Sequence, residues 1–414
     1  MDGRKEGSLM RIICFNSIKS HDGVTVYRAV QPLKYLESKG HTIVWMDYDD
    51  KDNLAAICKD ADILYMATPG GASFPMLAEL VKQSLIEQTM LNYGVPKEEM
   101  LANGLSIKPL KVVIDFDDDI FEINPHNVAY LFRGRKNVVL RDEFDNISYD
   151  KNGPIYLWKN GREYSMLGGV KKPFDLEKNK ENLKAQIEIL RLADLFTTPS
   201  SVLQKRLKRF VLNGETYLRP NAIDKTVFIN APKTYDKIRL LWTLSESHYF
   251  DWTGLYPSIG KMMKKYPNLE LVTVGSKFVS AHRAIPLSRW EHHGWVDMDD
   301  YGEFMSSLNC NLGIAHVKVD NFNNKKSPLK WEEYSALGMA TIASEFLYGS
   351  YIPEGCGVVY SNVAEFEDKL SNICEGKLPL APIAAAAHQH IMDNYELKVV
   401  GDAFEKRLEE MIRA

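Results

Sequence analysis

The most informative stretch of the sequence is residues 322–344, which read Phe-Asn-Asn-Lys-Lys-Ser-Pro-Leu-Lys-Trp-Glu-Glu-Tyr-Ser-Ala-Leu-Gly and then Met-Ala-Thr-Ile-Ala-Ser. Its polar start predicts a loop that leads into the first turn of a helix. Ser327 is a residue type that caps helices, and Pro328 suits the first helical position because its missing N–H costs nothing there. An apolar run follows Gly338 at once.

The start of this predicted helix has the character of a diphosphate site. Free backbone N–H groups and the positive end of the helix dipole point at whatever precedes the helix, and Lys325, Lys326 and Lys330 add charge of the same sign. Glu333 lies about one and a half turns further on, where its carboxylate can accept hydrogen bonds from sugar hydroxyls. The alternative is a solvated basic turn with Lys330 and Glu333 as a surface pair.

Strand and helix patterns alternate along both halves of the chain. Strands are predicted by apolar runs at 10–15, 41–46, 61–66, 111–116, 238–242, 269–275 and 310–315. This order implies parallel sheets covered by helices on both faces, with ligands beyond the carboxyl ends of the strands. A length of 414 residues fits two such domains. We therefore expect an α/β fold of two doubly wound, Rossmann-like domains.

Two segments interrupt the alternation. Residues 217–224, rich in Pro, Asn and Asp, predict the linker between the domains. Two Asn-Gly turns surround an aromatic strand within 147–162 and predict a β-hairpin, which we place in an insertion at about 121–179. Because it follows the predicted ligand rim, this insertion is expected to contact an acceptor.

The segment at 322–338 resembles the donor-site signature of retaining, two-domain (GT-B) glycosyltransferases of family four, Phe-Asn-x-x-Lys-Ser-x-x-Lys followed by Glu-Tyr-x-x-x-Gly. Residues 244–251 are similar to a Gly-Ser-x-x-His-x-x-Asp motif of the same superfamily, with Leu244 in place of the glycine. Lys325 stands where many members carry a first glutamate. The resemblance implies two domains facing each other across a cleft, at 1–220 and 221–395, with a terminal helix at 396–414 that crosses back to the first domain.

The resemblance also assigns expected roles. It implies transfer of a sugar, with retention, from a nucleoside diphosphate sugar to a hydroxyl acceptor. The expected catalytic residues are Asp117, His248 and Lys326. The expected donor-binding residues are Ser245, Asp251, Trp295, Val296, Asn323, Lys325, Lys326, Ser327, Lys330 and Glu333. On the acceptor side we expect His21, Gly23, Tyr27, Arg28, Asp118, Asp119, Arg133 and Arg135.

The carboxylates of Asp117, Asp118 and Asp119 follow a predicted strand and have several interpretations. Such a cluster can bind a divalent cation, hold sugar hydroxyls, keep one member protonated by mutual repulsion, or cap the next turn. The family resemblance favours Asp117 beside the donor sugar. Enzymes of this type bind the diphosphate with basic side chains and a helix dipole, so we infer no metal and no tightly bound cofactor. A UDP- or GDP-sugar is the expected donor substrate.

Composition narrows the class of protein and its expected location in the cell. The five cysteines are odd in number and scattered through apolar segments, which predicts buried thiols. No stretch has the length of an apolar membrane span and no signal-peptide core follows Met1, so we expect a cytoplasmic protein. A net charge of −4 argues against a protein that coats nucleic acid. The sequence does not determine the oligomeric state.

Three acceptor hypotheses stay open. Residues 117–130 contain Asp-Asp-Asp-x-Phe-x-x-Asn-Pro and Asn-x-Ala-Tyr, which resemble segments of phage-type glycosyltransferases. That resemblance implies hydroxymethylated pyrimidines in phage DNA as the acceptor, in the host cytoplasm, and basic residues at 133–136 and 205–209 suit DNA. The second hypothesis is a cell-surface glycan or a lipid-linked sugar. The third is a non-catalytic protein that only binds nucleotide sugars.

Overall fold

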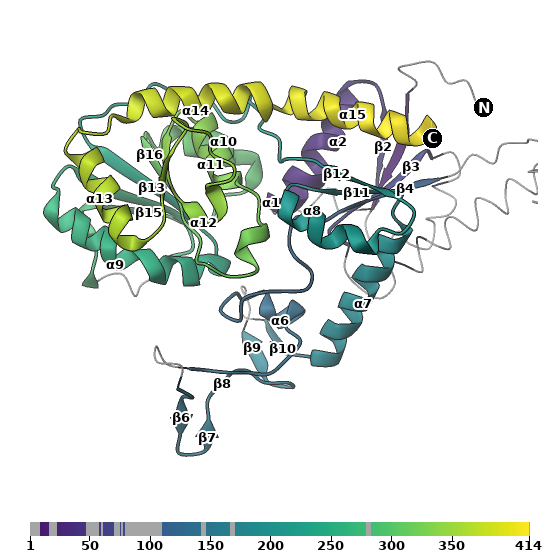
Figure 1. Ribbon diagram of the computed structural model, residues 1–414, viewed down its shortest axis with the longest axis horizontal. Coiled ribbons are helices and arrows are strands. Elements are labelled where there is room, and N and C mark those ends of the chain that lie inside the picture. Colours follow the sequence, from purple (N-terminus) through teal and green to yellow (C-terminus); the bar gives the residue numbers. More distant parts are fainter. Residues whose placement is uncertain are drawn as a thin grey trace, which may run out of the picture.

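The computed structural model describes residues 9–15, 23–46, 58, 61–69, 75, 78, 110–141, 146–165, 170–278 and 283–413. Two α/β domains lie side by side, and a pair of helices runs along both (Figure 1). A smaller inserted module projects from the first domain, below its sheet in this view.

The first domain is built on a parallel sheet. Among the described residues its strand order is β12-β11-β4-β3-β1-β2. The strands are β1 (Arg11–Cys14), β2 (Thr42–Trp45), β3 (Ile63–Ala67), β4 (Lys111–Asp115), β11 (Leu195–Thr198) and β12 (Glu215–Leu218). Both faces are buried, as expected for a parallel sheet. In β3, Leu64 and Met66 pack in the core on one face, and Ile63 and Tyr65 pack on the other.

Helices cover this sheet. They include α1 (Gly23–Thr25), η1 (Val26–Val30), α2 (Gln31–Ser38), α7 (Leu176–Leu192), α8 (Ser201–Leu207) and η3 (Lys208–Phe210). The start of α7 is capped by Asp175, whose carboxylate accepts from the backbone N–H groups of Glu177 and Lys178. Ser200 caps α8 in the same way, through the N–H group of Leu203.

The inserted module has a small core of its own, formed by Tyr130, Leu131, Trp158 and Phe174. It contains α6 (Tyr130–Arg133) and the strands β5 (Val138–Val139), β6 (Tyr149–Asp150), β7 (Gly153–Pro154), β8 (Tyr156–Trp158), β9 (Glu163–Ser165) and β10 (Lys171–Pro173). The hairpin of β6 and β7 turns at Gly153, whose φ of +112° is a conformation that favours glycine. The predicted hairpin is therefore present.

The second domain has a parallel sheet in the order β15-β14-β13-β16-β17-β18 within the described residues. Its strands are β13 (Ile238–Leu244), β14 (Leu269–Gly275), β15 (Trp290–His293), β16 (Leu312–Ala315), β17 (Ala340–Ser344) and β18 (Val358–Tyr360). Helical segments are η4 (Glu246–His248), α9 (Tyr249–Lys265), η6 (Leu287–Arg289), α10 (Met298–Ser307), η7 (Asn323–Lys325), α11 (Leu329–Ala336), α12 (Glu345–Tyr348), α13 (Val363–Cys374) and α14 (Leu380–Asn394).

The last helix, α15 (Leu397–Arg413), packs on the first domain. Phe404 and Leu408 are buried against the first sheet, and the Tyr35 hydroxyl donates to Asp402 at 2.5 Å. Figure 1 shows α14 over the second domain continuing into α15 over the first. At the crossing, the Ile223 N–H donates to the Tyr395 carbonyl at 2.7 Å, so the linker and the returning chain are paired where both pass between the domains.

Candidate active site

A cavity of about 240 Å³ lies at the carboxyl ends of β13 and β14. This is the position at which parallel α/β sheets bind ligands. Residues of η1 in the first domain and of α10 and α11 in the second close its other sides. The lining consists of Gly23, Tyr27, Thr243, Leu244, Ser245, His248, Val274, Gly275, Trp295, Val296, Met298, Tyr301, Leu329, Lys330 and Glu333.

Three polar side chains are linked at one side of this cavity. His248 Nδ1 lies 2.8 Å from Asp251 Oδ2, and the Lys330 ammonium lies 3.4 Å from His248 Nε2. Lys330 also donates to the Thr243 carbonyl at 3.0 Å. Asp251 accepts from the backbone N–H of Lys318 at 2.8 Å, which fixes the carboxylate against the loop after β16. The sequence prediction placed His248, Asp251 and Lys330 in one site, and the structure brings them together.

Burial sets the charge of this group. It lowers the pKa of His248 to about 4, with Lys330 acting in the same direction. A neutral imidazole can donate from Nδ1 to Asp251 and accept at Nε2 from Lys330. Burial also lowers the pKa of Lys330 to about 8, and nearby Lys326 contributes to the shift. The carboxylates of Glu333 and Asp251 oppose the shift of Lys330, and an anionic ligand beside Lys330 and Lys326 would favour the charged form in the same way.

Glu333 follows Lys330 by three positions in α11, so the two side chains lie on the same side of that helix. Its carboxylate accepts from the Tyr27 hydroxyl at 2.7 Å and from the Tyr301 hydroxyl at 3.4 Å. Burial raises the pKa of Glu333, although both tyrosine hydrogen bonds and Lys330 oppose that shift. We predicted Tyr27 on the acceptor side, whereas its hydroxyl faces Glu333 across the domain boundary, in the same cavity.

The loop between β16 and α11 differs from the prediction at its end. Helix α11 begins at Leu329 with Pro328 at the cap position, and Ser327 forms no cap. The Ser327 hydroxyl instead accepts from Asn221 Nδ2 at 3.0 Å, a partner in the linker that local sequence rules do not consider. Asn323 is buried and donates to the Lys318 carbonyl at 3.0 Å, so it holds the loop rather than facing the cavity.

Lys325 lies apart from the cavity. Its ammonium is 3.2 Å from Asp119 and 3.3 Å from Glu122, carboxylates of the first domain. The position that we predicted to contact the donor therefore forms an ion pair between the domains, because two carboxylates lie on that side of the loop. Lys326 lies 5.1 Å from the centroid of the Phe322 ring and acts on the pKa values of His248 and Lys330.

On the first-domain side, the turn after β4 carries the predicted aspartates. Asp117 is partly buried, and burial together with the Asp118 carboxylate raises its pKa to about 7. Asp118 pairs with Arg133 at 3.2 Å. An aspartate that titrates near neutrality is a feature of many catalytic sites, and mutual repulsion was one of the interpretations of this cluster.

Two predicted acceptor residues are buried and do not face an acceptor. Arg28 is 1% exposed, and it binds Asp115 through two nitrogens, at 2.8 and 2.6 Å. Arg219 reaches the same carboxylate at 3.0 Å. Asp119 is also 1% exposed and accepts from the Phe121 N–H at 2.9 Å. The sequence shows charged residues near the ends of strands, but it does not show that Arg28 and Arg219 pair with Asp115 inside the protein. The predicted His21 lies outside the described residues, while Gly23 lines the cavity.

Other lining residues were missed in the sequence analysis. Tyr301 comes from α10 and has no local motif. Gly275 had a readable signal, since a glycine at the end of a predicted strand can mark a close approach. Its φ is +101°, and a Cβ atom there would lie 2.1 Å from the Leu244 carbonyl oxygen.

Ser245, Trp295 and Val296 were predicted as donor-binding residues. Ser245 lines the cavity, and its hydroxyl lies 2.7 Å from that of Ser247. Trp295, at 65% exposed, borders the cavity beside Val296.

Within the part of the chain that the structure describes, no group of three His, Cys, Asp or Glu side chains is placed to hold a metal ion. Across the same residues, no helix combines the length and the apolar character that crossing a membrane requires. The five cysteines all lie within the described ranges, and four of them are buried.

Residues 259–405 match a protein-family model described as glycosyl transferase-like. No curated protein matches the sequence significantly. Among solved structures, a glycosyltransferase from Rickettsia africae is 12% identical, with a TM-score of 0.58 over 98% of this chain and 99% of that one. Anabaena Alr3699/HepE, solved with UDP and glucose, is 12% identical, with a TM-score of 0.56 over 97% and 100% of the chains.

A third similar structure is the pneumococcal O-GlcNAc transferase GtfA in complex with UDP and GlcNAc, 11% identical, with a TM-score of 0.50 over 88% of this chain and 60% of that one. At such identities the likeness concerns the fold. The predicted fold class is confirmed: this chain has the GT-B fold, with two parallel α/β domains. The phage-type resemblance finds no support in these matches.

Proposed function

We propose that this protein is a glycosyltransferase that moves a sugar from a nucleoside diphosphate sugar to a hydroxyl acceptor, with retention of the anomeric configuration. The observation that carries the proposal is the pairing of His248 with Lys330 in a cavity at the carboxyl ends of β13 and β14. Lys330 lies within the glycosyl transferase-like segment at residues 259–405, and His248 lies eleven positions before that segment, in the same domain. The GT-B fold and the family-four-like signature support the same reading.

The cavity has separate places for the parts of a nucleotide sugar. The diphosphate lies at Lys330, with Lys326 nearby and the neutral His248 beside it, because two ammonium groups attract a polyanion. Ribose hydroxyls reach Glu333, where they replace the tyrosine hydrogen bonds. The base lies against Trp295 and Val296 at the open side. We infer a UDP-sugar as donor, since two of the similar structures are described as complexes with UDP.

Catalysis then depends on charge that develops in the transition state. As the bond to the anomeric carbon breaks, negative charge grows on the leaving diphosphate, and fixed cations stabilise that state more than the ground state. Lys326 and Lys330 take this role, and His248, held by Asp251 at Nδ1, positions the Lys330 ammonium through its Nε2 acceptor. The family resemblance assigns Asp117, whose pKa is raised to about 7, to the transferred sugar, although Asp117 is not among the residues that line the donor cavity.

The Asp117→Asn variant tests the catalytic part. Replacing a group that acts mainly in the transition state should lower turnover by about a hundredfold or more, with donor affinity nearly unchanged. The assay measures release of UDP from a panel of UDP-sugars, beside a thermal melt. If Asp117 merely caps a turn, the variant will lose about 1 kcal/mol of stability and keep near-normal turnover.

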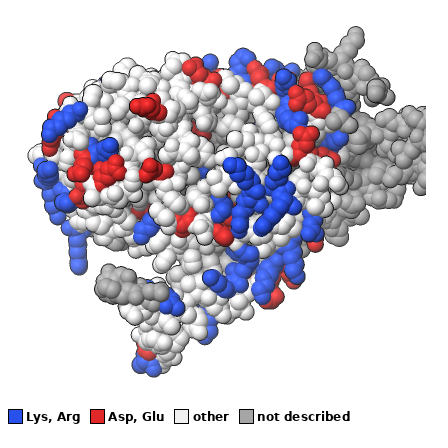
Figure 2. Space-filling view, viewed as in Figure 1, with Lys and Arg blue, Asp and Glu red and all other residues white. Residues whose placement is uncertain are grey.

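Two alternatives receive direct readouts in the same assay. A non-catalytic binder of nucleotide sugars would bind the donor without the slow hydrolysis that transferases show when no acceptor is present. Hydroxymethylated DNA is a second candidate acceptor, favoured by the Lys and Arg side chains that gather over α7 and α8 (Figure 2). An extended basic surface of this kind suits a polyanion.

A further inference from the structure

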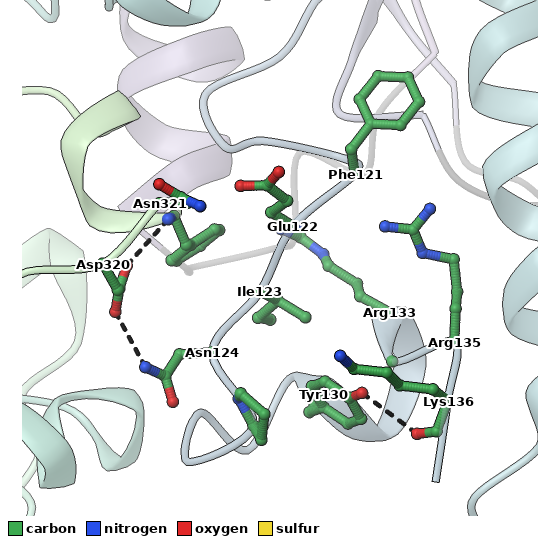
Figure 3. A pocket seen from close by; sticks show the side chains of 13 residues that line it. Phe121, Glu122, Ile123, Asn124, Tyr130, Arg133, Arg135, Lys136, Asp320 and Asn321 are labelled. Carbon is green, nitrogen blue, oxygen red and sulfur yellow. Dashed lines mark hydrogen bonds between the residues drawn. The ribbon is translucent and has the colours of Figure 1, made fainter. Parts of the chain in front are cut away.

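A second cavity, of about 540 Å³, lies between the inserted module and the second domain. Residues 121–125, Tyr130 and 133–136 form one side, and residues 320–322 form the other. In Figure 3, Asp320 and Asn321 lie opposite Arg133, Arg135 and Lys136. The chain that forms the second-domain side continues into α11, whose residues Leu329, Lys330 and Glu333 line the donor cavity.

The carboxylates in the wall are already occupied. Glu122 pairs with Arg206 at 3.1 Å and with Lys325 at 3.3 Å. Asp320 accepts from Asn124 Nδ2 at 3.0 Å and from backbone N–H groups of its own turn. These acids are therefore used to hold the cavity walls together.

The basic side chains that line this cavity have fewer carboxylate partners. Arg133 pairs with Asp118 at 3.2 Å. Within the described ranges, neither Arg135 nor Lys136 forms an ion pair with a carboxylate. Burial lowers the pKa of the Arg135 guanidinium, the carboxylates of Asp119 and Glu122 oppose that shift, and Arg206 adds to it. A partly buried guanidinium that has no carboxylate in direct contact is stabilised by an anion that enters the cavity, and the exposed Lys136 adds charge of the same sign.

We propose that this cavity binds the acceptor of the transfer reaction through a phosphate group held by Arg135 and Lys136. The proposal rests on the proposed function. A guanidinium binds a phosphate through two parallel hydrogen bonds, and a nearby ammonium adds charge. The volume is that of a small-molecule site. The rings of Phe121 and Tyr130 give the remainder of a sugar or polyol an apolar surface.

The phosphate has two possible sources with the same chemistry, a soluble sugar or polyol phosphate and a phospholipid headgroup. The second is relevant because Arg209 of η3 stacks on Phe121 at the rim, with its guanidinium 5.8 Å from the ring centroid. Together with Lys205, Arg206 and Lys208 it forms a basic surface beside the cavity. Figure 2 shows Lys and Arg gathered in that region of the molecule.

The experiment measures sugar transfer from UDP-sugars to matched pairs of acceptors: glucose 6-phosphate against glucose, glycerol 3-phosphate against glycerol, and phosphatidylglycerol against diacylglycerol, each of these two lipids carried in phosphatidylcholine vesicles. The same phosphates are titrated calorimetrically into protein saturated with UDP, which occupies the donor cavity. The variants are Arg135→Gln/Lys136→Gln and the control Lys151→Gln/Lys171→Gln, which removes two exposed lysines of the same module.

We expect the phosphorylated member of one pair to be preferred, and Arg135→Gln/Lys136→Gln to weaken its binding by about tenfold or more, as for a lost charge-assisted pair. The control variant should behave as wild type, and UDP affinity should be unchanged in both. Equal use of charged and uncharged acceptors, or transfer to hydroxymethylated duplex DNA alone, overturns the proposal while the glycosyltransferase assignment stands. Absence of UDP binding and of donor turnover overturns the proposed function itself.

Discussion

The Lys330 ammonium makes the donor site sensitive to pH. Burial lowers its pKa to about 8, so the free protein loses this charge as the pH rises through that value. A bound diphosphate favours the charged form. UDP affinity should therefore fall above pH 8, by up to about tenfold per pH unit. Calorimetry between about pH 7 and 9.5 measures the slope. In Lys330→Arg the slope should disappear, because a guanidinium stays charged throughout; the same slope in that variant assigns the titration to another group.

Site residues whose neighbours are local in the chain could be predicted from the sequence. His248, Asp251, Lys330 and Glu333 come from two short motifs, and helix geometry places Glu333 beyond Lys330. The partner of Glu333 was not predictable, because Tyr27 is 306 positions away in the chain. The same holds for Lys325, whose carboxylate partners come from the other domain. Side-chain partners across a domain boundary depend on packing that no local rule describes.

Among the elements, β4 is tied to its surroundings by Asp115, which is 0% exposed and contacts Arg28 of η1 and Arg219 of the linker. Burial alone would raise the pKa of Asp115, but the two guanidinium groups reverse the shift and lower it. Asp115→Asn leaves two buried cations without a counter-charge, which should cost about 3 to 5 kcal/mol of unfolding free energy.

Urea unfolding measures that loss, with Asp118→Asn as the control. Asp118 forms a partly exposed pair with Arg133, so its replacement should change stability by about 1 kcal/mol or less. If Asp115→Asn is as stable as the control variant, the buried network does not hold β4.

Element positions followed from periodicity wherever the elements are long. Strand β14 matches the predicted 269–275, and β4 begins at Lys111, the start of the predicted run 111–116. The start of α11 was misplaced by the Ser-Pro pair, because Ser327 takes a hydrogen bond from the linker instead of capping the helix. The short strands of the inserted module were predicted only as a hairpin, since their pairing depends on an aromatic cluster assembled from distant residues.

Over the whole molecule, the inserted module contacts the second domain beside the cavity of about 540 Å³ that we propose for the acceptor. His126 stacks on Phe250 with ring centroids 4.7 Å apart, and Asn124 donates to Asp320 at 3.0 Å. On the far side, the linker and the start of α15 are joined at Ile223. The two domains are therefore connected at both ends of the interface that contains the donor cavity, a geometry that can exclude water from a reactive donor.

The central claim is that the cavity between β13, β14 and α11 binds a nucleoside diphosphate. Calorimetric comparison of UDP with UMP tests it most directly, because Lys326 and Lys330 should contact the second phosphate. We predict that UDP binds about tenfold more tightly or better, as charge-assisted contacts require. The difference should disappear in Lys326→Gln/Lys330→Gln and persist in Lys264→Gln/Lys265→Gln, on the opposite end of α9. Equal affinities of the wild-type protein for UDP and UMP, or no binding of either, would contradict the account.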